Sequence, residues 1–536
     1  LRRLLVGNIK DIHGVPVSGK GLPRVCWKVG QNGTWTYSTG LSLGSSNYSF
    51  SFGEGVTLND TVYYFLVAQD GNSLPNTGSF PMKGAGGYTS NPPAASIPPT
   101  TPYWYKIIQS ICGTFTVGVG KDYETITQAI ADINSRDLTC PVTLLLTDNA
   151  YPSETWPIII NDIAGASQTN TLTIKPAPGA TPFITGAYTG VTPTWWSMFS
   201  LYGAQWVIFD GSNTPGGTDR SMTIQNTSGT SWHAPIGFYN NGIVGAANIM
   251  VKNCVLQATQ QILYNAQGIG FYSTTGKGGY RNITIQNNEI SSAKTGLSLG
   301  GVADYPSRNL KIINNTIGSA TNGYYISQIG IGVSNSDSVL IEGNELLGPA
   351  TGVAPPQALF AISIPGGVTN LKINRNKIHD WYHLGGNAAL GMYFSNSGNT
   401  TWTEITNNLI YDLRCPGSST NPSAANPYAI NIFNGSKFRI QHNTIIQRGN
   451  TLGSTACWSA CIYIHGNGTS IINNDIDLRN NLLVNSLQPA SGTPASKTFA
   501  VISNTPNCFS AVDNNDYFVN GINPRNGYLS AERNTL

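Results

Sequence analysis

The sequence predicts an all-β protein, in which a small antiparallel β-sandwich precedes a long parallel β-helix. First, one nine-residue phrase, NITIQNNEI at 282–290 and NLKIINNTI at 309–317, recurs to the end of the chain. Second, the apolar runs are short, β-branched and separated by Gly, Asn and Ser, which indicates strands rather than helix pairs. Third, only 10% of the residues are charged, whereas surface helices favour Glu and Lys. A phrase that repeats in this way indicates a solenoid of stacked strands.

The first domain is predicted over residues 1–83. The runs RVCWKVG, TWTYSTG, NYSFSF and TVYYFLVAQD are typical of strands, and turn-forming residues separate them. Their spacing and aromatic content favour an immunoglobulin-like or fibronectin-like β-sandwich. Residues 84–111 are rich in Gly and Pro and nearly free of charge, which predicts a semi-extended linker.

Residues 112–536 are predicted to form the β-helix, with a cap over 112–165 and coils over 166–536. The cap contains the best helix of the chain, DYETITQAIADIN, with Ile126, Ile130 and Ile133 on one face. Thr125 and Gln128 have the spacing of a capping box. We expect this helix to cover the first exposed rung of the strand array.

The recurring phrase begins near residues 221, 248, 282, 309, 338, 370, 402, 437, 475 and 509, and it defines three columns. The fourth and ninth slots are largely aliphatic, which predicts apolar files inside the coil. We expect the seventh slot to form a corner, with Asn in the left-handed conformation and carboxamides bonded from rung to rung. Thr227 and Cys254 take this slot in the first two phrases, so that corner must differ there. The predicted structural ladder consists of Asn288, Asn315, Asn344, Asn376, Asn408, Asn443, Asn481 and Asn515.

Several stretches resemble the large secreted β-helix proteins of Bacteroidota and related phyla. They are GLPRVCWKVGQNGTWTYSTG, GTFTVGVGKDYETITQAIADIN, LTIKPAPGATPFITG and NNDYFVNG. In that family an immunoglobulin-like module precedes a right-handed parallel β-helix. The resemblance implies export to the cell surface, often by the type IX secretion route with a C-terminal sorting domain. We expect any such sorting domain to lie outside this sequence.

The eight cysteines include no CxxC pair, which argues against zinc ribbons and redox motifs. Two alternatives remain open. The thiols are free and buried, or some form disulfides, with Cys457 and Cys461 as the first candidates. Disulfides would fit an oxidising, extracellular location.

One patch of the repeat carries candidate chemistry. Asp380 and Asp412 both lie ten residues after the start of their phrase, so we expect them to stack on neighbouring rungs. Carboxylates on adjacent rungs suit the acid and nucleophile of a glycosidase. Arg414 and His383 are further catalytic candidates, and Trp381 and Tyr382 are candidates for glycan binding. The alternative is structural: each Asp caps a turn, and Arg414 neutralises the pair.

The remaining features narrow the function classes. The net charge of +3 without a basic cluster argues against nucleic acid as a partner, and no apolar run reaches the ~18 residues of a membrane span. No cofactor is predicted, no metal-ligand spacing is present, and calcium has no clear site.

We therefore expect a non-enzymatic, extracellular surface rod that serves adhesion or structural assembly. Its expected partners are copies of itself, joined end to end into filaments or by strand addition of LRRLLV at 1–6, and surface glycans. The alternative is a polysaccharide lyase, a glycoside hydrolase or a non-catalytic glycan binder with its site on the β-helix face.

Overall fold

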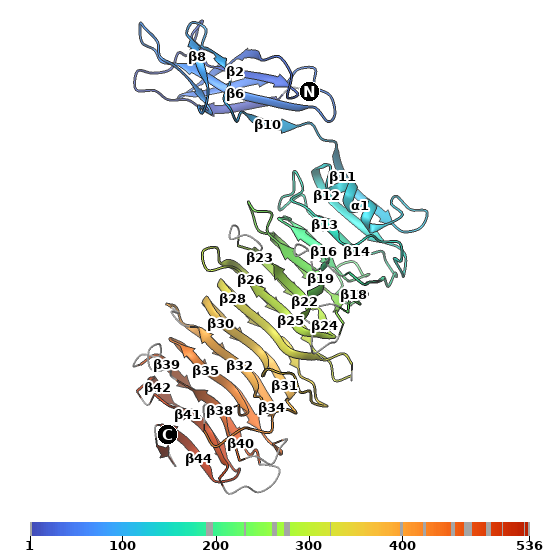
Figure 1. Ribbon diagram of the computed structural model, residues 1–536, viewed down its shortest axis with the longest axis vertical. Helices are drawn as coiled ribbons and strands as arrows, with labels where there is room; N and C mark the ends of the chain where they lie inside the picture. The colour runs from blue at the N-terminus through green and yellow to red at the C-terminus, as the bar shows by residue number, and fades with distance from the viewer. Residues whose placement is uncertain are drawn as a thin grey trace. The chain divides into compact units, whose positions relative to one another are not determined.

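A computed structural model describes residues 3–188, 197–229, 232–259, 265–272, 279–321, 323–396, 400–421, 425–451, 456–465, 474–488, 495–505, 507–529 and 531–533. The chain divides into two units, Leu1–Ser110 and Ile111–Leu536 (Figure 1). Over the described ranges, no helix has the length and apolarity needed to cross a membrane.

The first unit is built from antiparallel strands. One sheet has the order β1 (Arg3–Asn8), β5 (Asn47–Phe52), β4 (Leu41–Gly44). A second has the order β10 (Tyr103–Lys106), β6 (Thr61–Gln69), β2 (Arg24–Val29), β3 (Thr36–Thr39), and β7 (Thr77–Phe80) also pairs with β6. Alternate residues of β5 and β6 face a shared core, where Tyr48, Phe50 and Val62 are buried.

The linker predicted over residues 84–111 is wrong for most of its length. Strands β8 (Gly86–Thr89) and β9 (Ala94–Ile97) form a hairpin, and β10 runs antiparallel to β6. Tyr88 and Ala95 pack against the cluster that contains Cys26 and Phe65, and the Tyr37 hydroxyl donates to the carbonyl of Ala95 at 2.9 Å. These buried contacts outweigh the Gly and Pro content, because the prolines stand between the strands rather than within them.

The second unit begins with β11 (Ser110–Val117), α1 (Ile126–Ile133), β12 (Asp137–Leu146) and β13 (Ile158–Ile160). The predicted helix is confirmed. Thr125 is its N-cap, and its side chain accepts the Gln128 amide at 3.1 Å. Ile126, Ile130 and Ile133 are buried in the same cluster as the first rungs, so α1 covers the start of the core as expected.

Of the two alternatives for the cysteines, disulfides or free buried thiols, each holds for some of them. A disulfide joins Cys112 to Cys140, on β11 and β12, and the other six thiols are free and buried. The expectation that Cys457 and Cys461 take part in disulfides is wrong, because both are among the free, buried thiols.

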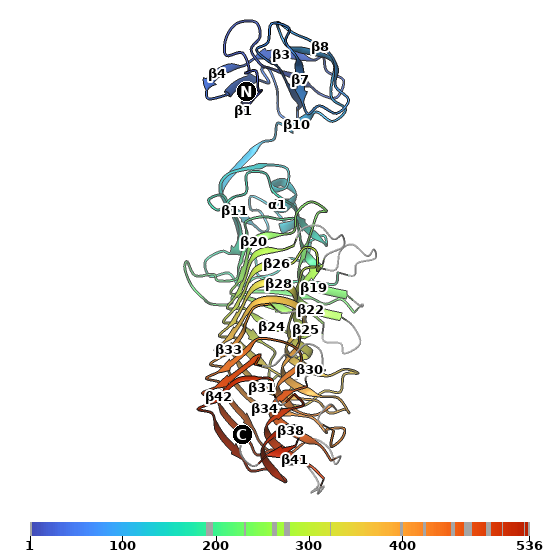
Figure 2. The same cartoon turned by 90° about the vertical axis from the view of Figure 1, so that its left-hand side faces the viewer.

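From β12 onward the chain forms a parallel β-helix, so the predicted all-β fold and coil architecture are confirmed (Figures 1 and 2). Each rung visits three faces in the order A, C, B, and strands on each face pair in parallel with the rungs before and after. Faces A and B merge into one 24-stranded sheet over the described residues, because β28 (Ile326–Glu342) and β30 (Leu359–Asn374) run from B into A without a break.

The strands of each face share one parallel ladder. Face A contains β14 (Leu172–Pro176), β17 (Val207–Asp210), β20 (Ala247–Lys252), β23 (Arg281–Gln286), β26 (Ser307–Ile313), the second halves of β28 and β30, β33 (Thr403–Thr406), β36 (Phe438–Gln441), β39 (Ile476–Arg479) and β42 (Phe509–Asp513). Face B contains β16 (Ser197–Tyr202), β19 (Trp232–Tyr239), β22 (Asn265–Tyr272), β25 (Ala293–Gly300), the first halves of β28 and β30, β32 (Ala389–Asn396), β35 (Tyr428–Gly435), β38 (Trp458–Ile464), β41 (Lys497–Ser503) and β44 (Pro524–Leu529), to which β45 (Glu532–Arg533) adds antiparallel. Face C contains β15 (Phe183–Gly186), β18 (Met222–Asn226), β21 (Cys254–Gln257), β24 (Glu289–Ser291), β27 (Thr316–Ile317), β29 (Glu345–Leu347), β31 (Lys377–Tyr382), β34 (Leu409–Arg414), β37 (Thr444–Gln447), β40 (Leu482–Asn485) and β43 (Asp516–Val519).

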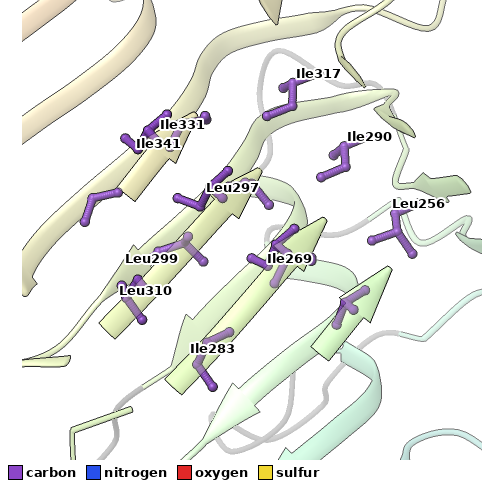
Figure 3. Packing of buried hydrophobic residues seen from close by; sticks show 14 of the residues in the cluster. Leu256, Ile269, Ile283, Ile290, Leu297, Leu299, Leu310, Ile317, Ile331 and Ile341 are labelled. Atoms are coloured by element: carbon purple, nitrogen blue, oxygen red, sulfur yellow. The ribbon is translucent and has the colours of Figure 1, made fainter. Parts of the chain in front are cut away.

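Aliphatic files fill the coil, as the repeat predicts. On face C, Leu256, Ile290 and Ile317 are aligned on consecutive rungs and fully buried (Figure 3). The alignment of the first phrase is wrong, because Phe209 and not Ile224 is the rung partner of Val251 in the fourth column. Ile224 pairs with Leu256, so it belongs to the ninth column rather than the fourth.

The asparagine column forms a continuous ladder. In each step from Asn288 to Asn515, the Oδ1 of the next Asn accepts both the backbone N–H and the Nδ2 of the preceding one, at 2.9–3.0 Å. Cys254 heads the column, and its backbone N–H donates to Asn288 Oδ1 at 2.9 Å. Its partner on the rung before is Met222, not Thr227.

The left-handed residue of the corner is not the ladder Asn, contrary to the prediction. It is the residue immediately before, with φ of +51° at Asn287, +55° at Arg375 and +56° at Asn407. The two tasks are therefore divided: the sixth slot turns the chain, and the seventh slot satisfies the buried backbone donors.

Candidate active site

Asp380 and Asp412 lie at the same position of consecutive rungs on face C. The register pairs His379 with Tyr411 and Trp381 with Leu413 on either side of them. Both aspartates are left-handed, with φ of +60° and +54°. The left-handed residue adds one position to the strand, so the inward-outward alternation breaks at the two carboxylates.

Asp380 is part of a chain of polar contacts. Its Oδ2 is 2.8 Å from His379 Nδ1, and its Oδ1 accepts the Tyr382 hydroxyl at 3.1 Å. The other ring nitrogen, Nε2, is 3.1 Å from Oε1 of Glu345 on the preceding rung. The His379 side chain is 8% exposed and that of Asp380 is 27% exposed. A neutral imidazole donates to one of these carboxylates, and an imidazole with both nitrogens protonated donates to both.

Glu345, at the outer end of this series of polar contacts, pairs with a charged side chain. Glu345 also accepts Lys377 Nζ at 2.7 Å. This hydrogen bond, together with that of His379, lowers the pKa of Glu345 despite partial burial. The Tyr411 ring stacks on the imidazole of His379, with centroids 4.8 Å apart and 5° between the planes. His379 is thereby fixed between a neighbouring ring and two carboxylates.

Asp412 is held by arginine. Arg448 donates from Nε to Oδ1 at 3.1 Å and from Nη2 to Oδ2 at 3.2 Å, and Arg414 Nη2 lies 4.0 Å from Oδ1. The Asp412 side chain is 9% exposed, while Arg448 is 61% exposed. Such a fork holds the Asp412 carboxylate in a fixed orientation.

Arg414 and Tyr382 connect the two carboxylates. The Arg414 guanidinium lies over the Tyr382 ring, 4.9 Å from its centroid. Arg414 Nε is buried, and no hydrogen-bond partner for it occurs among the described residues. Burial, as the largest cause, raises the pKa of Tyr382 to about 12, so its hydroxyl stays protonated and continues to donate to Asp380. We call Glu345, His379, Asp380, Tyr382, Asp412, Arg414 and Arg448 the carboxylate patch.

Two predicted residues do not belong to this patch. Trp381 is fully buried and donates from Nε1 to the carbonyl of Leu346 at 3.2 Å, so it cannot contact a glycan as predicted. His383 is also fully buried, and its ring nitrogens bond backbone atoms of Gly385 and Gln357. Both side chains pack the coil and its loop instead.

Three residues of the patch were not predicted: Glu345, His379 and Arg448. Glu345 and Arg448 come from the rungs before and after the two aspartates. Comparing each phrase with the same column of its neighbours, rather than with its own flanking residues, would have found them.

One group of ligand-type side chains in the described residues could hold a metal ion: Asp11, His13 and Asp70 of the first unit. Asp70 already accepts backbone and side-chain N–H groups of Asn72 and Asn76 at 2.8–3.3 Å. The Asp70 carboxylate therefore stabilises the loop of residues 70–76 by these hydrogen bonds, and we assign no metal to the cluster.

No family model matches the chain, and no curated protein matches it. Among solved structures it is similar to the GH136 lacto-N-biosidase of Eubacterium ramulus, with a TM-score of 0.46, 12% identity and coverage of 76% of this chain and 67% of that one. It is also similar to the Agl-KA catalytic domain, with a TM-score of 0.31, 13% identity and coverage of 98% and 86%. A third is the catalytic domain of a GH87 α-1,3-glucanase in complex with nigerose, with a TM-score of 0.21, 10% identity and coverage of 98% and 85%. We assign no residue a role from these structures.

Proposed function

We propose that this protein is a glycoside hydrolase that acts on polysaccharide at the carboxylate patch. The observation that carries the proposal is the stacking of Asp380 on Asp412 at equivalent positions of consecutive rungs. Paired strands are ~4.8 Å apart, and retaining glycosidases place their two carboxyl groups ~5–5.5 Å apart. The spacing of rungs therefore suits a retaining mechanism.

The two carboxylates have different surroundings, which suits different roles. Asp412, whose carboxylate is bound by Arg448, is the group that faces the developing positive charge of the sugar. Asp380, in contact with His379 and Tyr382, is the proton donor to the glycosidic oxygen. His379 can return a proton to Asp380, because its Nδ1 lies 2.8 Å from Oδ2 while its Nε2 stays in contact with Glu345.

The test is hydrolysis by the Asp380→Asn and Asp412→Asn variants on a panel of neutral and acidic polysaccharides. We expect each variant to lose at least about a thousandfold in rate, as general acid–base and covalent roles predict. Glu404→Gln is the matched control, because this carboxylate pairs with Lys372 at 3.1 Å on face A and should leave the rate unchanged. A wild-type protein without activity on the panel, or variants as active as wild type, would refute the proposal. Products that absorb as unsaturated uronates would indicate a lyase instead.

A second candidate function is the structural or adhesive role on the cell surface. The observation that favours it is that Arg448 binds both oxygens of Asp412. In this role the ion pair of Asp412 and Arg448 connects neighbouring rungs and stabilises the coil. The Cys112–Cys140 disulfide supports an extracellular location. In this proposal the antiparallel first unit is an immunoglobulin-like module that presents the β-helix. Sedimentation at high concentration tests it: self-association supports the role, and a strict monomer that binds no surface glycan contradicts it.

A further inference from the structure

Face B carries a hollow that the proposed chemistry on face C does not use. Its volume is about 380 Å³, within the range of ~300–1,000 Å³ for ligand pockets. It extends over the outer side of β22, β25, β28 and β30. The lining residues are Phe271, Thr295, Ser298, Leu299, Gly300, Gly301, Val302, Ile329, Gly332, Val333, Ser334, Ser363 and Pro365.

The hollow exists because small residues follow one another on consecutive rungs. Gly270, Ser298, Gly332 and Ser363 are aligned in a single outward file, and the next member of the file is Tyr393. Ser298, Gly332 and Ser363 line the hollow and leave a groove along the stack. The groove ends at Gly270, where Gln267 and Tyr272 fill the space, and at the Tyr393 ring on the other side.

The chemistry of the walls selects a neutral, hydroxyl-rich ligand. None of the lining residues is charged, and Thr295, Ser298, Ser334 and Ser363 bring hydroxyl groups that both donate and accept. Ile329 and Pro365 line the hollow with apolar side chains, whereas the Phe271 ring packs inward against Phe238 and Tyr280. Sugars combine apolar ring faces with equatorial hydroxyls, which is the complement of such a wall.

One buried acceptor beside the hollow lacks a partner. Gln267 is 6% exposed, and its Oε1 makes no hydrogen bond within the described residues. This oxygen lies over Gly270 on the outer side of face B, beside the ring and hydroxyl of Tyr272. Its residue is the rung partner of Thr295, which lines the hollow. A buried acceptor without a donor costs free energy, so a ligand hydroxyl that donates to it would be stabilised.

The far end offers an aromatic platform. Phe360 and Tyr393 are half-buried, with ring centroids 5.1 Å apart, and they are the rung neighbours of Ile329 and Ser363 in the hollow. The rings stand where the small-residue file stops. A sugar unit in the hollow would have the next unit of its chain against this pair.

We propose that the face B hollow between Gln267 and the Phe360–Tyr393 pair is a binding site for a short segment of neutral oligosaccharide. It is a second site, on a different face from the carboxylate patch, and it does not depend on hydrolysis. Its expected effect is to hold a neutral glycan chain on the β-helix surface.

The decisive variant fills the hollow. A Cβ at Gly332 meets no atom closer than 3.6 Å, and the residue has no left-handed φ, so Gly332→Leu is compatible with the fold. Gly386→Leu is the matched control, because a Cβ there meets nothing within 4 Å and the residue does not line the hollow. Thr295→Ala and Ser363→Ala remove hydroxyls without filling space.

The probes are neutral gluco-, galacto- and N-acetylglucosamine-containing di- to tetrasaccharides, measured by saturation-transfer NMR and calorimetry on the full chain. At least one should bind, and Gly332→Leu should weaken it by at least about tenfold, since most of a pocket ligand's surface is buried in its pocket. Gly386→Leu should bind as wild type does. Melting temperatures confirm that each variant is folded.

Three results would overturn the proposal: no neutral saccharide binds, binding survives Gly332→Leu, or uncharged Ser-rich peptides compete for the hollow more strongly than any sugar. Repeating the titration with Asp380→Asn separates the two sites. If that variant binds as wild type does while no hydrolysis is ever found, the face C proposal fails alone. If hydrolysis is found but Gly332→Leu changes no affinity, the face B proposal fails alone.

Discussion

Replacing Asn408 by Ala removes one step of the carboxamide ladder at its centre. Asn408 Nδ2 donates to the Ile373 carbonyl at 3.0 Å and to Asn443 Oδ1 at 2.9 Å. Asn408 Oδ1 accepts the backbone N–H and the Nδ2 of Asn376, both at 3.0 Å. All four bonds are buried and all four are lost, whereas the bond from the Asn408 backbone to Asn443 is kept.

The expected cost follows from these four bonds. At a net ~1 kcal/mol each, their loss lowers the free energy of unfolding by about 4 kcal/mol. The backbone N–H of Asn376 is left buried without its acceptor, which excludes a value near zero. Since a domain is stable by only ~5–15 kcal/mol, the loss is easily measured.

The control variant is Asn407→Gly, one residue earlier. Asn407 is exposed, has a φ of +56° and makes one side-chain hydrogen bond, to Asn374. Glycine adopts that conformation without strain, so the change should stay within about 1 kcal/mol.

Urea unfolding followed by circular dichroism gives the free energies, and hydrogen exchange locates the effect. Amides of the corner that contains Asn376 and Asn408 should exchange faster in Asn408→Ala than in wild type, because a solenoid loses stability locally. A change below about 1 kcal/mol together with unaltered protection at this corner would show that the ladder contributes no stability, and the structural role assigned to the column would be wrong.

Three further outcomes are expected. Replacing both Cys112 and Cys140 by Ser releases a crosslink of sequence separation 28 and should cost the cap about 3.5 kcal/mol by the chain-entropy relation, measured by calorimetry. Hydrogen bonds from Ser212 and its neighbours hold the pKa of Asp219 well below its usual value. Its contribution to stability is therefore complete above the ordinary carboxyl pKa of 3.8 and is lost as the pH falls through the lowered pKa, so Asp219→Asn should flatten the acid limb of urea titrations. Trp381→Ala should cost about 3–5 kcal/mol, whereas Trp381→Phe should leave glycan binding at both faces unchanged, which binding assays would check.

The repeat was predictable because every rung must bury the same aliphatic positions and satisfy the same buried amide at its corner. The aliphatic residue at slot four is buried in every phrase from Val251 to Leu478, and the buried amide at slot seven needs an acceptor. The first phrase was misaligned because Met222 occupies the corner there, and a side chain without polar atoms gives no signal to align. The hairpin of β8 and β9 was missed for a related reason. Its strands are four residues each and pack through Tyr88 and Ala95, which local composition does not distinguish from a linker.

The patch was predictable only in its two aspartates, since the rest depends on lateral neighbours. Glu345 and Arg448 precede and follow the aspartates by more than 30 residues, and only the rung register brings them to Asp380 and Asp412. Within one phrase, KIHDWYHLGG, the first histidine is the one that reaches the patch and the second packs a loop. That choice is made by the left-handed backbone at Asp380, a conformation that the sequence allows but does not require.

The asparagine ladder positions the strands that carry the carboxylate patch. Asn376, Asn408 and Asn443 directly precede β31, β34 and β37, and these strands carry or adjoin Asp380, Asp412 and Arg448. Each ladder step therefore fixes the position of a strand along the stack four or five residues before its charged side chain. Because the separation of the carboxylates is set by that stacking, the buried carboxamides that stabilise the coil also hold the geometry that the proposed hydrolysis requires. A ladder variant that stays folded should for this reason change activity at the patch more than binding in the face B hollow, whose lining strands do not follow the asparagine corner.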